Sequence, residues 1–192
     1  HEPAAGADAD PLNAALAGRP DLMAGRTSLT LHSGMKDMSE NVFLNIKNKS
    51  VTIVADVEVP AGGGEGVILA QGGRFGGWSL YLKDGKPTYA YNYLGMQRSS
   101  VTAQDPLPAG KATVRLEFAY DGGGMGKGGV GTLYVNDQQV GSGRIERTQA
   151  MVFSADETAD VGIDGATPVV EDYRTPRGQF SGKIGKVTVS VH

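Results

Sequence analysis

The sequence predicts an all-β fold, in which two antiparallel sheets pack face to face as a jelly-roll sandwich. Three observations support this fold class. Apolar and polar residues alternate with a period of two in several segments after residue 28. Glycine accounts for 29 of the 192 residues, about twice its usual share of roughly 7%, which indicates many tight turns. No helical period of any length separates the strand patterns, and this favours a sandwich over an α/β fold.

The clearest strands are predicted at residues 51–59 and 112–120. One side of the first carries Val51, Ile53, Ala55, Val57 and Val59, and the other carries Thr52, Asp56 and Glu58, with Val54 as the exception. In the second, Val114, Leu116, Phe118 and Tyr120 alternate with Thr113, Arg115, Glu117 and Ala119. Such alternation is typical of strands with one buried face. Further strands are expected at residues 66–71, 77–83, 86–92, 132–135 and 183–191.

Two turns predict hairpins. Asp84-Gly85 within "KDGKP" separates two strand patterns and is a strong hairpin signal, and "VNDQQV" at residues 135–140 indicates a second, without glycine. The last strand is expected to pair centrally or beside the first. The predicted core consists of Ile53, Val57, Leu80, Leu82, Val114, Leu116, Phe118, Leu133, Val135, Val187 and Val189.

The length fits one domain, which we expect to span residues 28–192. Residues 1–27 are rich in Ala, Gly and Pro, and they are expected to form an irregular linker or wrapping segment. At most one short helix is predicted there, with Asp10 as its N-cap, Pro11 in its first turn and Gly18 after its last.

Composition excludes several functional classes. The net charge of -3 and the isoelectric point near 5.6 argue against a nucleic-acid partner, which needs a basic surface. The absence of cysteine excludes disulfides, thiolate metal sites and cysteine nucleophiles. No apolar run approaches the roughly 18 residues that span a bilayer, so no membrane partner is expected. The compartment stays open, with the periplasm or secretion slightly favoured over the cytoplasm.

The glycine-rich stretch "DGGGMGKGGVGT" at residues 121–132 invites comparison with a phosphate-binding loop. A P-loop requires G-x-x-x-x-G-K-[ST], but Asp121 stands at the first glycine position and Gly128 follows Lys127. A G-x-G-x-x-G pattern does occur, at Gly124, Gly126 and Gly129, yet a strand pattern follows it instead of the helix that such a motif needs. We therefore expect a connection between two antiparallel strands.

Two sets of carboxylates are candidates for chemistry. Asp56 and Glu58 share one strand face, as the acids of retaining glycosidases do, although solvent-facing charge is the simpler interpretation. The acidic stretch of residues 156–172 contains Asp156, Asp160 and Asp164, whose oxygens could hold calcium. Its spacing matches no EF-hand loop, and a solvated or arginine-paired surface is the alternative. No cofactor is expected in this chain, although a calcium ion is possible.

Aromatic and polar residues gather in "GGRFGGWSLYLKDGKPTYAYNYLGMQR". Trp78, Leu80 and Leu82 are expected to face the core, which turns Ser79, Tyr81 and Lys83 outward. Aromatic faces beside Arg and Asn suit sugars or anions. The substrate-binding candidates in this segment are Arg74, Trp78, Tyr81, Asn92 and Arg98. The alternative is that most of the tyrosines pack in the core.

Long runs of the sequence resemble the C-terminal region of large bacterial arylsulfatases. The runs that carry the resemblance include "EGVILAQGGRFGGWSLYLKDGKPTYAYNYLGMQR", "RLEFAYDGGGMGKGGVGTLYVNDQQVGSGRIERT" and "FSADETADVGID", and together they cover nearly the whole chain from about Asn13. The resemblance implies a β-sandwich similar to concanavalin A-like lectins and laminin G modules. In such sulfatases the chemistry belongs to a separate α/β domain, with a formylglycine made from a C/S-x-P-x-R motif beside a calcium ion.

That motif does not occur in this sequence. The most similar segment, residues 173–177, lacks the Cys or Ser that could be converted to formylglycine. No catalytic or calcium-binding residue of the sulfatase centre can therefore be assigned in this sequence. The resemblance thus implies a non-catalytic module that packs on a sulfatase catalytic domain and shapes substrate access. Two alternatives stay open: an independent lectin-like domain that binds a sulfated or other carbohydrate, and a glycoside hydrolase that uses Asp56 and Glu58.

Overall fold

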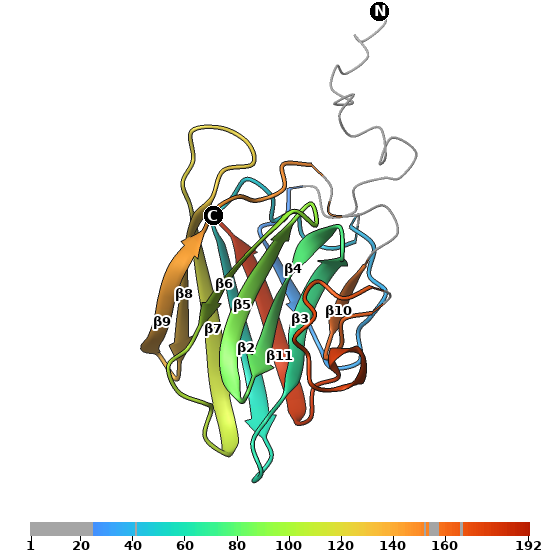
Figure 1. Cartoon of the computed structure of the whole chain (residues 1–192), viewed down its shortest axis with the longest axis vertical. Helices are drawn as coiled ribbons and strands as arrows, with labels where there is room; N and C mark the ends of the chain where they lie inside the picture. Colours follow the sequence, from blue (N-terminus) through green and yellow to red (C-terminus); the bar gives the residue numbers. More distant parts are fainter. Residues whose placement is uncertain (1–24, 41, 152, 154–157, 166) are drawn as a thin grey trace, which may run out of the picture.

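The computed structural model describes residues 25–40, 42–151, 153, 158–165 and 167–192. They form two antiparallel sheets that pack face to face (Figure 1). The first sheet has the order β1 (Ser28–Leu31), β11 (Lys183–Val191), β2 (Val51–Val59), β7 (Gly110–Tyr120), β8 (Gly129–Val135), β9 (Gln138–Ile145). The second has the order β10 (Ala159–Val161), β3 (Gly66–Gly73), β4 (Gly76–Lys83), β5 (Lys86–Tyr93), β6 (Gln97–Thr102). Together they confirm the all-β sandwich.

Helical structure within the described residues is confined to the 3-10 turn η2 (Pro176–Gly178). That part of the chain contains no helix long and apolar enough to cross a membrane. The helix predicted from Asp10 lies outside the described residues. The boundary expected near residue 28 stays a prediction, although β1 begins at Ser28.

The core lies between the two sheets, where the alternation of β2 and β7 directs apolar side chains inward. Trp78 is fully buried at its centre, with ring centroids 6.3 Å from Phe43 and 6.2 Å from Tyr89. All predicted core residues are buried except Val135, which is half-buried and packs against the core. Burial of this much apolar surface is the main favourable contribution to the stability of the fold.

The predicted turns and the predicted place of the last strand are confirmed. Asp84 and Gly85 have φ angles of 52° and 76°, and Asn136 and Asp137 have 49° and 67°. Positive φ at both central residues is the mark of a type I′ hairpin, whose twist matches that of its strands. β11 lies between β1 and β2 in the six-stranded sheet.

The outer face of the five-stranded sheet differs from the prediction. Ser79 and Tyr81 do point away from the core, but their exposed fractions are only 0% and 2%. The chain between β10 and β11 crosses this face, and its Val169 and Val170 pack with Tyr81 in a second apolar cluster (Figure 1). Tyr81 therefore faces outward as predicted but is covered by this chain, because alternation reveals which face a residue occupies but not what covers that face.

Candidate functional site

The outward face of the six-stranded sheet, unlike that of the five-stranded sheet, leaves its polar side chains exposed or half-exposed. The register places Asp56 of β2 opposite Thr113 of β7, and Glu58 opposite Lys111. On the other side of β2, Glu58 is opposite Lys183 of β11. Three neighbouring strands thus bring residues 58, 111 and 183, far apart in sequence, into one row of charged side chains.

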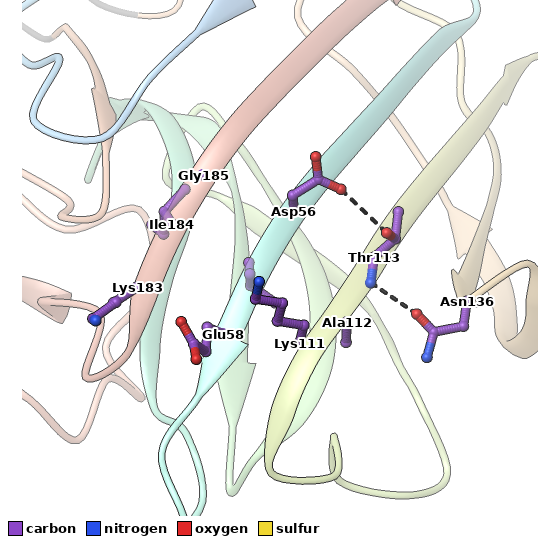
Figure 2. Close-up of a pocket in the computed structure, with 10 residues that line it drawn as sticks. Asp56, Glu58, Lys111, Ala112, Thr113, Asn136, Lys183, Ile184 and Gly185 are labelled. Atoms are coloured by element: carbon purple, nitrogen blue, oxygen red, sulfur yellow. Dashed lines mark hydrogen bonds between the residues drawn. The ribbon is translucent and has the colours of Figure 1, made fainter.

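This row lies in an open groove with a volume of about 520 Å³, which we call the β2 groove. It is formed by β2, β7, β11 and the turn between β8 and β9. Its lining residues are Asp56, Val57, Glu58, Lys111, Ala112, Thr113, Asn136, Lys183, Ile184 and Gly185 (Figure 2).

A bulge in β11 helps to open the groove. Ile184 pairs with Val57 and Val187 with Ala55, so three steps along β11 match two along β2. Such a bulge bends the strand and leaves the extra residues unpaired. Gly185 lies in this bulge, and a Cβ there would be 3.5 Å from the Cβ of Asp56. The glycine therefore keeps the space beside Asp56 free of a side chain.

Hydrogen bonds fix the polar groups on one side of the groove. The Thr113 hydroxyl donates to the Asp56 carboxylate at 3.1 Å, and the Thr113 amide donates to Asn136 Oδ1 at 2.9 Å (Figure 2). One Asp56 oxygen and the Asn136 amide nitrogen stay available to a ligand. These groups sit on paired strands and a tight turn, so their positions are set before any ligand arrives.

The charged groups of the groove have no partner of opposite charge within bonding distance. Of the six salt bridges in the described part of the chain, none involves Glu58, Lys111 or Lys183. Lys111 extends from β7 toward β2, whereas Lys183 points away from Glu58 (Figure 2). The groove therefore offers carboxylate acceptors and ammonium donors side by side, which suits a ligand rich in hydroxyl groups.

A rigid aromatic group lies beside the groove on the same face. The guanidinium of Arg115 stacks 4.2 Å from the ring centroid of Tyr134. The same guanidinium bonds the Asp137 carboxylate at 2.6 Å. The register places Tyr134 near Thr113 and Asn136 on this face, although Tyr134 does not line the groove itself.

The five predicted substrate-binding residues do not converge on one exposed site. Trp78 is fully buried, and its indole N–H donates to Gln71 Oε1 at 3.1 Å. Asn92 is also fully buried and donates to the carbonyl oxygens of Arg74 and Val169, at 2.8 and 3.0 Å. Both side chains are held by protein groups within the fold, and their role as ligand contacts stays a prediction.

Tyr81 is held in a similar way, and its hydroxyl donates to the Asp172 carboxylate at 2.9 Å. Burial, followed by the charge of Asp172, raises the pKa of Tyr81 well above its usual range. Tyr81 and Arg98 do line one hollow of about 400 Å³ on the outer face of the five-stranded sheet. Arg98 is exposed there, and the exposed Arg74 lies in the turn between β3 and β4.

Two of the three predicted calcium ligands, Asp160 and Asp164, accept hydrogen bonds that hold the chain following β10 in place. The Asp160 carboxylate accepts amide hydrogens from Asp37 at 2.7 Å and Gly165 at 2.9 Å. Asp164 accepts from the Val169 amide at 2.7 Å and from the Tyr173 hydroxyl at 2.5 Å. Asp156 lies outside the described residues. Nowhere in the described ranges do three or more His, Asp or Glu side chains gather as a metal site, and calcium stays a prediction.

The sequence did not single out Lys111, Asn136 or Lys183. Each is an ordinary polar residue in its own segment, and only the register of β2 with β7 and β11 brings them beside Asp56 and Glu58. The alternation of residues 51–59 was the one sequence pattern that pointed to this site, since it placed the carboxylates of Asp56 and Glu58 on the outward face.

No protein-family model and no curated protein sequence matches the chain. Solved structures of similar fold include a K499G mutant of the NanB sialidase from Streptococcus pneumoniae, with a TM-score of 0.56, 13% identity, and coverage of 85% of this chain and 25% of that one. The CBM40 of the Ruminococcus gnavus IT-sialidase gives a TM-score of 0.52 and 15% identity, and covers 75% of this chain and 77% of that one. The LG1-3 region of the laminin alpha2 chain gives 0.51 and 12%, with coverage of 87% and 30%.

At these identities the likeness is one of fold. It agrees with the two-sheet, concanavalin-like sandwich described above. The chain spans only 25% of the sialidase and 30% of the laminin structure.

Proposed function

We propose that this chain is a non-catalytic, lectin-like module that binds carbohydrate in the β2 groove. The observation that carries the proposal is the groove itself, an open hollow on a rigid sheet where Asp56, Glu58 and Lys111 present acceptors and donors together. Polyhydroxylated ligands are recognised by a few fixed polar groups of this kind. The fold supports the proposal, because the similar CBM40 was solved bound to α2,3 and α2,6 sialyllactose.

Each lining group has a defined role in this proposal. The carboxylates of Asp56 and Glu58 accept hydrogen bonds from sugar hydroxyls, and the ammonium of Lys111 and the amide of Asn136 donate to ring or hydroxyl oxygens.

The test is glycan binding by the isolated chain, first on an array and then by calorimetry with the best ligand. Asp56→Ala and Glu58→Ala should each weaken binding about tenfold, since a hydrogen bond to a charged group contributes about 1.5 kcal/mol or more. Asp105→Ala removes an exposed carboxylate outside the groove and should bind like the parent chain. If an Asp56→Ala/Glu58→Ala double variant folds normally and binds the glycan with unchanged affinity, the proposal is wrong.

We also propose that the module belongs to a bacterial arylsulfatase, in which it packs on the catalytic domain and shapes access to that centre. This part rests on the sequence resemblance alone, and it favours a periplasmic or secreted location. The coding sequence immediately before His1 tests it. A C/S-x-P-x-R motif within an upstream α/β domain is the expected finding, and an upstream region without any sulfatase sequence contradicts it.

A glycoside hydrolase that uses Asp56 and Glu58 is the second candidate, because both carboxylates line the same groove. If the chain is such a hydrolase, it should slowly release reducing sugar from a bound β-glucan. Glu58→Gln should abolish that release while the ligand still binds, whereas the binding module releases no sugar in either form.

A further inference from the structure

A second hollow lies at the opposite end of the six-stranded sheet, under the glycine-rich loop of residues 121–128. This loop joins the end of β7 to the start of β8, whereas Asn136 of the β2 groove follows the end of β8. The loop projects from the end of the sandwich, away from the β8–β9 turn (Figure 1). The hollow, which we call the loop cavity, has a volume of about 500 Å³.

The loop is held in place at its base. The Tyr120 hydroxyl donates to the Gly124 carbonyl at 2.5 Å and accepts the Lys127 amide at 3.0 Å. The Gly126 amide donates to Asn48 Oδ1 at 2.8 Å. Lys127 therefore has a fixed backbone position at the cavity wall, which a freely moving linker would not give it.

Gly122 and Gly123 allow the loop to adopt its backbone conformation. Gly122 and Gly123 have φ angles of 74° and 75°, and no atom lies within 4 Å of a Cβ placed at either position. Space is therefore not what selects glycine there. The left-handed backbone does, because other residues adopt it only at a cost of about 1 kcal/mol or more. The sequence thus specifies a particular curved loop over the cavity.

The cavity is positively charged in an acidic protein. Its charged lining groups are Lys127, Arg144, Arg147, Asp121 and Glu146. Arg144 forms a salt bridge with Asp121. Lys127 and Arg147 appear in none of the salt bridges that the described residues form. Set against the single remaining carboxylate, Glu146, these two cations leave the cavity with one net positive charge.

Apolar surface accompanies these charges. The Arg147 guanidinium lies 5.9 Å from the ring centroid of Tyr93, which also lines the cavity. Met125 lines the loop side and is 55% exposed. An aromatic ring and a thioether beside two unpaired cations suit a ligand that has both an apolar ring face and an anionic group.

We propose that the loop cavity is a second ligand subsite, which binds the oxyanion of an acidic glycan, either a sulfate ester or a sugar carboxylate. Lys127 and Arg147 bind the oxyanion, and Tyr93 and Met125 pack against the ring that carries it. The proposal shares with the proposed function only the premise that the ligand is a glycan, and it uses none of the residues of the β2 groove.

The test is calorimetry at low and at physiological salt, with a chondroitin sulfate oligosaccharide, its chemically desulfated form, and inorganic sulfate as probes. Lys127→Gln/Arg147→Gln should weaken binding of the sulfated probe at least tenfold and flatten its salt dependence. Arg26→Gln/Lys36→Gln removes the same charge from exposed positions outside the cavity and should bind like the parent chain. Unfolding curves must coincide for all variants.

The outcomes separate the alternatives. If the desulfated probe binds as well as the sulfated one, the recognised group is the carboxylate. If only the sulfated probe binds, the group is the sulfate. Failure of both oligosaccharides to bind, or equal affinity in the cavity variant and the parent chain, overturns the proposal. Loss of binding only in Asp56→Ala/Glu58→Ala leaves the β2 groove as the sole site, and loss only in the cavity variant leaves the loop cavity as the sole site.

Discussion

At the scale of single residues, Asn92 illustrates how a buried polar side chain can resemble a binding residue in the sequence. Its amide donates to the carbonyls of Arg74 and Val169, and its Oδ1 accepts the Gly95 amide at 2.9 Å. The residue thereby ties the β5–β6 turn to the β3–β4 turn and to the chain that covers the sheet. A composition of Arg, Asn and Tyr is common to ligand sites and to such structural ties, and the sequence alone could not distinguish them.

Asn92→Ala should therefore destabilise the fold without changing the chemistry of either proposed subsite. Removal of the side-chain amide leaves the buried carbonyl of Val169 and the part-buried carbonyl of Arg74 and amide of Gly95 without this partner, and the expected loss is about 2–4 kcal/mol in free energy of unfolding. Urea denaturation measures it. Gln104→Ala, an exposed amide in the β6–β7 loop, should change stability by less than about 0.5 kcal/mol. A similar small effect for Asn92→Ala contradicts the structural role.

Tyr89 makes a second prediction at this scale, for stability at high pH. Burial, followed by the neighbouring Tyr91, raises the pKa of Tyr89 well above 10.0 in the folded chain. The unfolded chain releases this proton at about pH 10. The stability that depends on the protonated phenol is complete below that pH and is lost as the pH rises toward the folded pKa.

Between pH 9 and 11 the free energy of unfolding of the parent chain should therefore fall by about 1.4 kcal/mol more than that of Tyr89→Phe. Urea unfolding between pH 9 and 11 measures both slopes. Equal slopes for the two proteins would show that the Tyr89 proton does not contribute.

At the scale of elements, the segment between β10 and β11 is what makes the five-stranded sheet a closed face. Tyr173 links this segment to the sheet, since its hydroxyl contacts Ser79 Oγ at 2.9 Å and Asp164 Oδ2 at 2.5 Å. Its ring meets Tyr81 edge-on, with centroids 5.3 Å apart. This one side chain therefore connects β4 to the covering chain.

Tyr173→Phe keeps the ring contact and removes both hydrogen bonds. We expect a loss of about 1–3 kcal/mol in stability and faster hydrogen exchange in residues 167–180, because the segment would open locally. Amides of β7, in the other sheet, serve as the internal control and should keep their protection relative to global unfolding. Faster exchange spread evenly over both sheets would mean that the segment does not open on its own.

Elements with one clear apolar face were predictable, and those at the sheet edges were not. β2, β7 and β11 are interior strands whose alternation or apolar content marks them in the sequence. β6, β9 and β10 are edge strands; residues 97–102 and 159–161 were not predicted as strands, and the predicted hairpin at residues 135–140 implied only the start of β9. Edge strands pair on one side only and bury less, so their sequences need less alternation.

At the scale of the whole molecule, the candidate site depends on the order of strands in the sheet. Alternation predicted that Asp56 and Glu58 face outward, which is as far as a local pattern reaches. Lys183 and Lys111 flank these carboxylates because β11 and β7 lie on either side of β2. This topology brings together residues that are more than 120 positions apart in the sequence. The glycine-rich loop was correctly predicted as a strand connection, but the cations beneath it come from other segments.

The same topology predicts that the two proposed subsites act independently. The β2 groove and the loop cavity lie at opposite ends of β8, whose seven residues extend over about 23 Å. Effects of substitutions so far apart, without shared contacts, are expected to add within about 0.5 kcal/mol. For an acidic oligosaccharide that contacts both subsites, the loss of binding free energy in Glu58→Ala/Lys127→Gln should therefore equal the sum of the two single losses. Calorimetry of the four proteins completes the cycle. A deviation above about 1 kcal/mol would mean that the two sites are coupled through the ligand or through the sheet.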